Sequence, residues 1–397
     1  MNLSANLHLN SKLPHVGTTV FTVMSALAAE HGAVNLGQGF PDFHCDARLL
    51  QYMQDAMTAG HNQYPPMAGV AVLREAVANK IEHLYGLKFD ANSEITIAAG
   101  ATQALQTAIT AVVHAGDEVI IFEPVYDSYD PIIRLCGGVP IYARLHYPDY
   151  RPNFAELAAL ITPRTRAIII NSPHNPTGAI WTAVEMQALE ALLAPTNIIL
   201  ISDEVYEHMV FDGARHESVA RYPKLAERAF IVSSFGKTYH VTGWKVAYCA
   251  APQALMMEFR KVHQFVVFTV HTPSQYALAQ YMQHESHLHL SAFYQAKRDY
   301  FLAQVTQNAQ EQSGNSLRWH HSAGSYFVSA SYGHASNLSA QDFAQKLVRE
   351  VGVACIPTSA FYHDGHDDKI VRFCFAKKEE TLARAATLLR KMDAVLV

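Results

Sequence analysis

The sequence predicts an α/β protein, in which helices cover a mostly parallel β-sheet and a smaller α+β unit lies beside it. Five short apolar runs are continuous rather than alternating, as in strands that are buried on both faces of a sheet. Helical stretches separate these runs, which is the order of elements found in parallel sheets. A chain of 397 residues is also too long for one ordinary core, and its length favours two domains.

The five predicted strands alternate with helices along one continuous part of the chain. They are Glu94 to Ala98, Glu118 to Phe122, Ala167 to Ile170, Ile198 to Ile201 and Phe230 to Val232. With the helices between them, these strands define a large α/β domain, which we expect to span residues 47–284.

The remainder of the chain has a different order of elements. Apolar residues have helical spacing in Ser286 to Arg318 and in Ala340 to Val351, and strand patterns in Gly324 to Ser329 and Ile370 to Phe375. We expect residues 1–46 and 285–397 to form a smaller α+β domain that closes over the active site. The sequence has no long Pro/Ser linker, so the two domains should pack closely.

Composition and charge exclude several classes of partner. The formal net charge is −5, only 16% of residues are charged and no block of like charges occurs, so we expect no binding to nucleic acid or anionic membranes. The apolar runs are far shorter than the roughly 20 residues of a membrane span, and the first residues lack the pattern of a secretory signal. Five cysteines lie far apart, with neither zinc-motif nor disulfide-framework spacing. We therefore predict a soluble, cytoplasmic protein with a small-molecule partner.

Polar and aromatic residues follow each of the five predicted strands. In an open parallel sheet ligands bind beyond the carboxyl ends of the strands, so these residues should meet at one edge. The helix predicted after Gly100 would present its N-terminus there, which suits a phosphate. In chain order the residues are Gly100, Ala101 and Thr102, then Tyr126, then Asn171 and Asn175, then Asp203 and Tyr206, and finally Ser234 and Lys237. A purely structural sheet has no need of them, so we predict a ligand site.

Lys237 allows two interpretations. Gly236-Lys237-Thr238 is similar to the end of a nucleotide-binding P-loop, but that loop needs a glycine at the position of Ile231. Because the preceding residues have the pattern of a buried strand, the lysine is expected at a strand tip, where it can form an imine with a cofactor aldehyde. An aromatic aldehyde cofactor also needs an acid for its ring nitrogen, donors for its hydroxyl, a stacking aromatic residue and a phosphate site. The strand-end residues include a candidate for each role.

These residues give the chain a resemblance to the class I aminotransferases, which are pyridoxal-phosphate enzymes of fold type I. The similarity runs from about Phe21 to the C-terminus. The matching motifs are Asn35 to Phe43, Tyr64-Pro65, Gly100 to Gln103, Asn171 to Gly178, Asp203 to Tyr206, Ser234 to Lys245 and Val371 to Phe373. Within the class, Leu36 to Phe43 and Arg372 to Phe375 most resemble bacterial methionine aminotransferases and kynurenine/glutamine aminotransferases.

The resemblance implies roles for the residues around the cofactor ring. Lys237 would form the imine with pyridoxal 5′-phosphate and move the substrate proton. Asp203 would pair with the pyridinium nitrogen, which makes the ring an electron sink. Tyr206 and Asn175 would donate to the ring hydroxyl, and Tyr126 would stack on the ring.

The resemblance also implies a phosphate site and a homodimer. Phosphate would be held by Gly100, Ala101 and Thr102 at a helix N-terminus, by the Ser234 hydroxyl and by Lys245. Most of the class has arginine at the position of Lys245; lysine keeps the charge but lacks the planar fork, and the kynurenine subgroup tends to have lysine there. Tyr64 matches a tyrosine that reaches the phosphate from the neighbouring subunit.

Substrate residues follow from the same comparison. Arg372 would clamp the α-carboxylate of the substrate, with Asn171 and the backbone of Gly37 close to it. Phe21 matches a side-chain pocket position and is equally consistent with a hydrophobic wall. The expected reaction transfers the amino group of methionine and of aromatic or other neutral L-amino acids to a 2-oxo acid.

Other functions stay open at this point. Carbon–sulfur β-elimination of cysteine conjugates would use the same scaffold, and the sequence does not separate it from amino transfer. A cofactor-binding regulatory module usually carries a DNA-binding extension, for which this chain has no room. A zinc helix would need histidine where Leu288 follows His284-Glu285-Ser286-His287, so no metal is expected.

Overall fold

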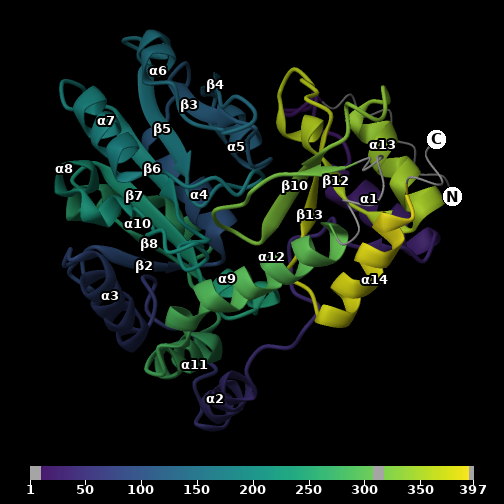
Figure 1. The fold of residues 1–397 in the computed structure, drawn as a ribbon. Helices are drawn as coiled ribbons and strands as arrows, with labels where there is room; N and C mark the ends of the chain where they lie inside the picture. The colour runs from purple at the N-terminus through teal and green to yellow at the C-terminus, as the bar shows by residue number, and fades with distance from the viewer. Residues whose placement is uncertain (1–9, 307–316, 393–397) are drawn as a thin grey trace, which may run out of the picture.

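The computed structural model describes residues 10–306 and 317–392. Its largest sheet has seven strands in the order β2-β8-β7-β6-β5-β3-β4 and forms one side of the molecule in Figure 1. The strands are β2 (Ile95–Ala98), β3 (Glu118–Glu123), β4 (Val139–Arg144), β5 (Thr165–Asn171), β6 (Ile199–Asp203), β7 (Ala229–Ser234) and β8 (Ala247–Ala250).

All five predicted strands are present, and the mostly parallel sheet is confirmed. β4, β3, β5, β6 and β7 are parallel neighbours, whereas β8 is antiparallel to both β7 and β2. Because β8 reverses direction between them, β2 runs the same way as β7, and all five predicted strands end at the same edge. The prediction omitted β4 and β8. β4 is a half-exposed edge strand that contains Pro140 and Arg144, so it lacks a continuous apolar run.

Helices cover both faces of this sheet, as predicted. Neighbouring residues of β3 show why the strands are apolar throughout, since Ile120 packs into the core on one face and Ile121 into the core on the other. One face is covered by α4 (Ala101–Val112), α5 (Tyr129–Leu135) and α10 (Gln253–Val266). The other is covered by α3 (Ala71–Tyr85), α6 (Phe154–Leu160), α7 (Ala183–Leu193), α8 (Pro223–Ala226) and α11 (Thr272–Met282), with α2 (Ala47–Thr58) packed on α11.

A second, smaller sheet lies on the other side of the molecule (Figure 1). Its antiparallel order is β12-β13-β10-β9, with β9 (Arg318–Trp319), β10 (Phe327–Ser331), β12 (Ile356–Pro357) and β13 (Ile370–Cys374). The helices beside it are α1 (Val20–Glu30), α12 (Leu290–Thr306), α13 (Ala340–Lys346) and α14 (Glu379–Arg390), and a π-helical turn (Leu347–Val351) extends α13. The short strands β1 (Val34–Asn35) and β11 (Val353–Ala354) pair in parallel, so the early part of the chain joins its late part.

Two details of the second sheet differ from the prediction. The strand expected at Gly324 to Ser329 begins only at Phe327. The Gly324 N–H instead donates to the carbonyl of Gly178, and the Ser325 N–H donates to that of Met209. Arg318, expected at the end of a helical stretch, lies in β9, and residues 307–316 of that stretch lie outside the described residues. The domain boundaries at residues 47 and 284 stay a prediction. Over residues 10–306 and 317–392, no helix is both long and apolar enough to cross a membrane.

Candidate active site

A cavity of about 230 Å³ lies between the carboxyl edge of the large sheet and the strands β10 and β13. The structure brings thirteen of the predicted site residues together around it: Phe21, Gly100, Ala101, Thr102, Tyr126, Asn171, Asn175, Asp203, Tyr206, Ser234, Lys237, Lys245 and Arg372. Gly37 and Tyr64 are not among the lining residues. Gly37 contributes its carbonyl oxygen to Arg372, whereas Tyr64 is 80% exposed on the surface of its own chain.

Lys237 enters the cavity from α9 (Phe235–Thr238), the short helix that directly follows β7. Its Nζ donates hydrogen bonds to the Tyr326 hydroxyl at 2.8 Å and to the carbonyl oxygen of Gly39 at 3.1 Å. Burial lowers the pKa of Lys237 to about 8, and the charges of Lys245 and Arg372 act in the same direction. Part of the amine is therefore neutral near physiological pH, as a nucleophile and proton acceptor must be.

Asp203 stands at the end of β6 and is only 3% exposed. The Tyr129 hydroxyl donates to its Oδ2 at 2.5 Å, and the Val205 N–H donates to its Oδ1 at 3.3 Å. Burial raises the pKa of Asp203 to about 6, although the hydrogen bond from Tyr129 opposes the rise. The charged form of a buried carboxylate is stabilised most by a cationic partner, such as a protonated ring nitrogen.

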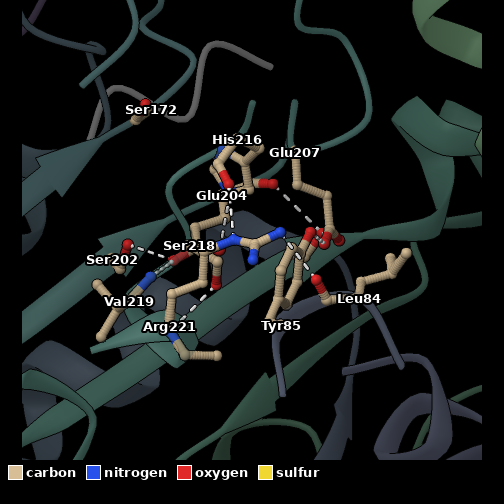
Figure 2. A network of polar contacts seen from close by, with 12 residues as sticks. Leu84, Tyr85, Ser172, Ser202, Glu204, Glu207, His216, Ser218, Val219 and Arg221 are labelled. Atoms are coloured by element: carbon tan, nitrogen blue, oxygen red, sulfur yellow. Dashed lines mark hydrogen bonds and ion pairs between the residues drawn. The ribbon is translucent and has the colours of Figure 1, made fainter. Parts of the chain in front are cut away.

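Glu204 anchors the chain immediately after Asp203. Its carboxylate accepts from the Ser202 hydroxyl at 2.8 Å and from the Val219 N–H at 2.9 Å, and its Oε2 lies 3.0 Å from His216 Nε2. Figure 2 shows these side chains gathered on one network of polar contacts. Glu204 is 2% exposed and does not line the cavity, so its bonds hold the end of β6 from the side away from the cavity.

Glu207 anchors the same segment after Tyr206. Lys80 Nζ donates to its Oε1 at 2.6 Å, the Ser233 hydroxyl donates to Oε1 at 2.5 Å and the Tyr85 hydroxyl donates to Oε2 at 2.5 Å. Burial alone would raise the pKa of Glu207, but Lys80 and the other partners hold it well below its usual range. Asp203 and Tyr206 thus line the cavity, whereas Glu204 and Glu207 are not among its lining residues. Figure 2 shows both glutamates within the polar network that holds this segment.

An anion site lies at the N-terminus of α4. Gly100 caps this helix at φ +86°, and within the described residues the helix has no side-chain cap hydrogen bond. A Cβ atom at Gly100 would lie 2.9 Å from Lys245 Nζ, so only glycine lets the ammonium approach the helix this closely. Ser234 lines the same cavity. Helix N–H groups, a hydroxyl and an ammonium are the donors that a phosphate needs.

Arg372 lies in the middle of β13 and is 1% exposed. Its Nη1 donates to Asn175 Oδ1 at 2.6 Å and its Nη2 to the Gly37 carbonyl at 3.1 Å, while its buried Nε has no partner among the described residues. The guanidinium lies 3.8 Å from the centre of the Phe327 ring. Burial lowers the pKa of Arg372 to about 10, so it stays cationic at neutral pH and is available to a carboxylate.

Asn171, which was expected close to the substrate α-carboxylate, uses its side-chain amide in hydrogen bonds to the backbone. Its Nδ2 donates to the backbone carbonyl of Asp203 at 2.9 Å, and its Oδ1 accepts from the N–H of Asn175 at 2.8 Å. It therefore joins the ends of β5 and β6, and in this structure Asn175 is the asparagine that contacts Arg372.

Sequence reasoning missed several residues of the site. Tyr129 is the first residue of α5, and its hydroxyl donates to Asp203. Its place in the sequence carries no signal of this contact. Gly39, Tyr326 and Phe327 also belong to the site. The last two lie near the start of β10, in a run that reads as an ordinary buried strand, so their pattern carried no functional signal.

The residues around the cavity fit pyridoxal phosphate. A phosphate would meet the α4 N-terminus and Lys245, a ring nitrogen would meet the buried carboxylate of Asp203, and an aldehyde would meet the amine of Lys237. The cavity can bind anionic groups at two places. One is beside Lys245, which closely approaches Gly100, and the other is beside Arg372, whose Nε has no partner among the described residues. The donor set thus suits both the cofactor and a substrate carboxylate.

Comparisons with known proteins agree with this fit. The family model described as aminotransferase class I and II matches residues 32–389. The chain is 49% identical over 384 residues to the methionine aminotransferase of Escherichia coli, covering 96% of this chain and 98% of the relative. It is 34% identical over 414 residues to the kynurenine–oxoglutarate transaminase of Dictyostelium discoideum, covering 95% and 94%. The chain also matches a solved structure from Escherichia coli, of a protein whose crystal structure and reactivity identify a methionine aminotransferase function. The TM-score is 0.93 at 48% identity, and the match covers 97% of this chain and 100% of that one.

Proposed function

We propose a substrate class for this chain, which belongs to the class I and II aminotransferases and so uses pyridoxal 5′-phosphate. The enzyme transfers the amino group of methionine and of aromatic or other neutral L-amino acids to a 2-oxo acid. The observation that carries the proposal is the meeting of Lys237, Asp203 and Arg372 around one cavity. An amine of lowered pKa, a buried carboxylate and a carboxylate-binding arginine are the three groups that this reaction requires.

The bound cofactor supplies an aldehyde that takes up amino groups and a ring that withdraws electrons. The chain holds it at several points. Lys245, Ser234 and the N-terminus of α4 would bind the phosphate, Asp203 would keep the ring nitrogen protonated, and Tyr126 would stack on the ring. Tyr206 and Asn175 would donate hydrogen bonds to the ring hydroxyl.

Lys237 carries the proton. Because its pKa is about 8, the neutral amine is available to accept the α-proton of the bound amino acid at Nζ and to return it to the cofactor side. From α9, the short helix that follows β7, Nζ would bond to the aldehyde of a bound cofactor. Burial of the cavity keeps bulk water from competing for the proton.

Arg372 orients the substrate. Its guanidinium binds the α-carboxylate, and the aromatic rings of Phe327, Phe361 and Phe21, at 3.8, 5.2 and 5.4 Å from the guanidinium, form an apolar wall beside it. The cations that line the described part of the cavity are Lys237, Lys245 and Arg372. Each already has a role, so none is left for an acidic side chain, and this favours neutral substrates.

The visible absorbance of the purified protein tests this function. We expect a yellow protein whose visible band changes when methionine is added, because the amino acid takes the place of Lys237 on the cofactor. A panel of amino acids at a fixed 2-oxo acid should rank methionine and aromatic substrates above aspartate. A colourless protein that stays inert after pyridoxal phosphate is supplied would contradict the proposal. Release of pyruvate and ammonia from a cysteine conjugate, faster than amino transfer, would favour the β-elimination alternative.

We also propose that the active unit is a homodimer to which Tyr64 contributes. Tyr64 is 80% exposed and packs edge-on against Phe268 at 5.3 Å, and Phe268 is itself 51% exposed. Phe265, at the end of α10, is 86% exposed. Large exposed aromatic side chains that lie together are typical of a contact surface. In a dimer they would be covered, and Tyr64 would lie at the partner's phosphate.

Replacing Phe265 by glutamate is expected to convert the dimer to monomer and to lower activity together with cofactor retention, because a buried, unpaired charge opposes association. Sedimentation velocity measures the oligomeric state. Val184→Glu is the matched control, since Val184 is 74% exposed at the start of α7 and should leave the dimer intact. A wild-type protein that is fully active as a monomer would refute the shared site.

The cellular location proposed from the sequence is the cytoplasm. The structure contains five free cysteines, of which Cys249, Cys355 and Cys374 are buried. Unpaired, widely spaced cysteines are usual in proteins of a reducing compartment, and this supports the proposal.

A further inference from the structure

Tyr326 is a buried tyrosine whose hydroxyl contacts the amine of Lys237. The residue lies just before β10 and is 0% exposed. Its oxygen accepts a hydrogen bond from Lys237 Nζ at 2.8 Å, and its hydroxyl donates to the carbonyl oxygen of Gly39. Lys237 Nζ donates to the same carbonyl at 3.1 Å. The amine, the hydroxyl and the carbonyl thus form a closed triangle built from three distant parts of the chain.

This triangle offers the amine acceptors only. Because the Tyr326 hydroxyl donates to Gly39, its lone pairs are what face Lys237, and the Gly39 carbonyl has no proton to donate. Two acceptors stabilise the protonated form of an amine relative to the neutral form. The triangle is therefore suited to an ammonium group, which is what Lys237 becomes after it accepts a proton.

The position of the hydroxyl is fixed by packing. The Tyr326 ring lies edge-on to Tyr206, with centroids 5.1 Å apart and an angle of 82°, and against Phe327 at 4.9 Å. Gly39 is held equally closely, since a Cβ atom there would lie 2.8 Å from the Phe327 ring. The triangle is thus built into the aromatic core of the site and does not depend on a mobile side chain.

We propose that Tyr326 and the Gly39 carbonyl form the docking site that receives the protonated side chain of Lys237 whenever it is not bonded to the cofactor. Tyr326 is then a positioning residue for the proton transfer that Lys237 carries out. The inference rests on the proposed role of Lys237 and adds to it a defined place for the released ammonium.

Other charged and titratable groups also face Lys237. They are Asp203 at the end of β6, Lys245 near the start of β8, Arg372 and Cys374 on β13, and Tyr206 after β6. Asp203 and the two cations act in opposite directions on the Lys237 pKa. All of them remain when only the oxygen of Tyr326 is removed, so a change in the titration of Lys237 can be assigned to that oxygen.

The test is the pH dependence of Lys237 acylation in the full-length chain freed of cofactor. Acetic anhydride reacts with the neutral amine, and mass spectrometry of the Lys237 peptide measures the extent of reaction over a pH series around the pKa of about 8. The midpoint is the pH at which half of the Lys237 amine is neutral and reactive. In Tyr326→Phe the ammonium loses an acceptor, and we expect this midpoint to fall by about one pH unit. A loss of structure alone would expose the amine and raise the midpoint instead.

Tyr294→Phe is the matched control. Tyr294 is also 0% exposed, its ring lies 5.8 Å from that of Tyr326, and its hydroxyl has no partner within the described part of the chain. Its midpoint should equal that of the wild type. A Tyr326→Phe midpoint equal to the wild-type value, or a shift of the same size in Tyr294→Phe, would overturn the inference.

Gly39→Ala perturbs the second acceptor of the triangle and tests the inference if Tyr326→Phe does not fold. The added Cβ would lie 2.8 Å from the Phe327 ring and 3.4 Å from the Tyr326 ring, so it would disturb the packing of the triangle. We expect the midpoint again to fall, and an unchanged midpoint would count against the docking site. Borohydride reduction of the holoenzyme and peptide mapping separately test the proposed function. Cofactor found on another lysine would refute the role of Lys237 itself, whatever the midpoints are.

Discussion

Replacing Lys237 by alanine is expected to lower the rate of amino transfer by on the order of 10⁴-fold while leaving the cofactor bound. The loss is large because one side chain both bonds to the aldehyde and carries the proton, and a positioned proton acceptor alone contributes about 10²- to 10⁴-fold. Binding should persist because the phosphate cradle at Gly100 and Lys245 and the carboxylate of Asp203 are unchanged. Cofactor content after gel filtration and single-turnover rates measure the two effects.

Lys297→Ala is the matched control for this substitution. Lys297 is a half-buried lysine whose Nζ donates to the carbonyl of Lys377 at 2.9 Å and does not line the cavity. Its replacement should leave the rate within a few fold of the wild type. Activity of the Lys237→Ala protein near the wild-type level would show that another amine does the chemistry.

Asp203→Asn is expected to change activity and stability in opposite directions. With cofactor, asparagine has no charge to keep the ring nitrogen protonated, and the rate should fall by about 10²- to 10³-fold. Without cofactor, the wild-type carboxylate is destabilising at high pH, because burial raises its pKa to about 6 from a usual 3.8. The neutral asparagine removes this cost while it still accepts the hydrogen bond from Tyr129.

The sign of the stability effect follows from the direction of the pKa shift. A carboxyl group with a raised pKa in the folded state contributes its stability below its unfolded pKa and loses it as the pH rises through about 6. At pH well above 6 the cofactor-free Asp203→Asn protein should therefore exceed the wild type in free energy of unfolding by up to ~3 kcal/mol. The difference should vanish below about pH 4.

Denaturant unfolding of the cofactor-free proteins at the two pH values measures this difference. Asp212→Asn is a control with the opposite expected sign, because the hydrogen bond from Arg298 lowers the pKa of Asp212 to about 2. That substitution should weaken the protein at neutral pH. An Asp203→Asn protein no more stable than the wild type at high pH would show that Asp203 does not carry a buried charge.

The strand-end residues explain how much of the site could be predicted from sequence. Asp203, Lys237 and Thr102 follow continuous apolar runs, and strands that run parallel through a sheet must end at the same edge. Their convergence is a consequence of the fold class, which the apolar pattern already indicates. Gly100 could be placed in the same way, since a glycine at the start of a helix after a strand is typical of phosphate sites.

The partners of these residues could not be predicted in this way. Tyr129, Tyr326 and Glu207 have no distinguishing pattern, because a tyrosine or glutamate within an ordinary element is more often packing or surface. The edge strand β4 was missed because its partial exposure removes the continuous apolar signal. The strand β8 is apolar and buried, but no long helix separates it from β7, so it does not fit the strand–helix alternation on which the prediction rested.

The sequence by itself determined the fold class, the edge at which the ligand lies and the residues whose types are specific to the chemistry, because local pattern and chain direction suffice for these. Only the tertiary structure decided which groups touch. The contact of Lys237 with Tyr326 and Gly39 joins residues far apart in the chain, and so does that of Arg372 with Asn175 and Gly37. Such contacts depend on how two sheets pack against each other, and the packing of one sheet on another leaves no periodic trace in either segment.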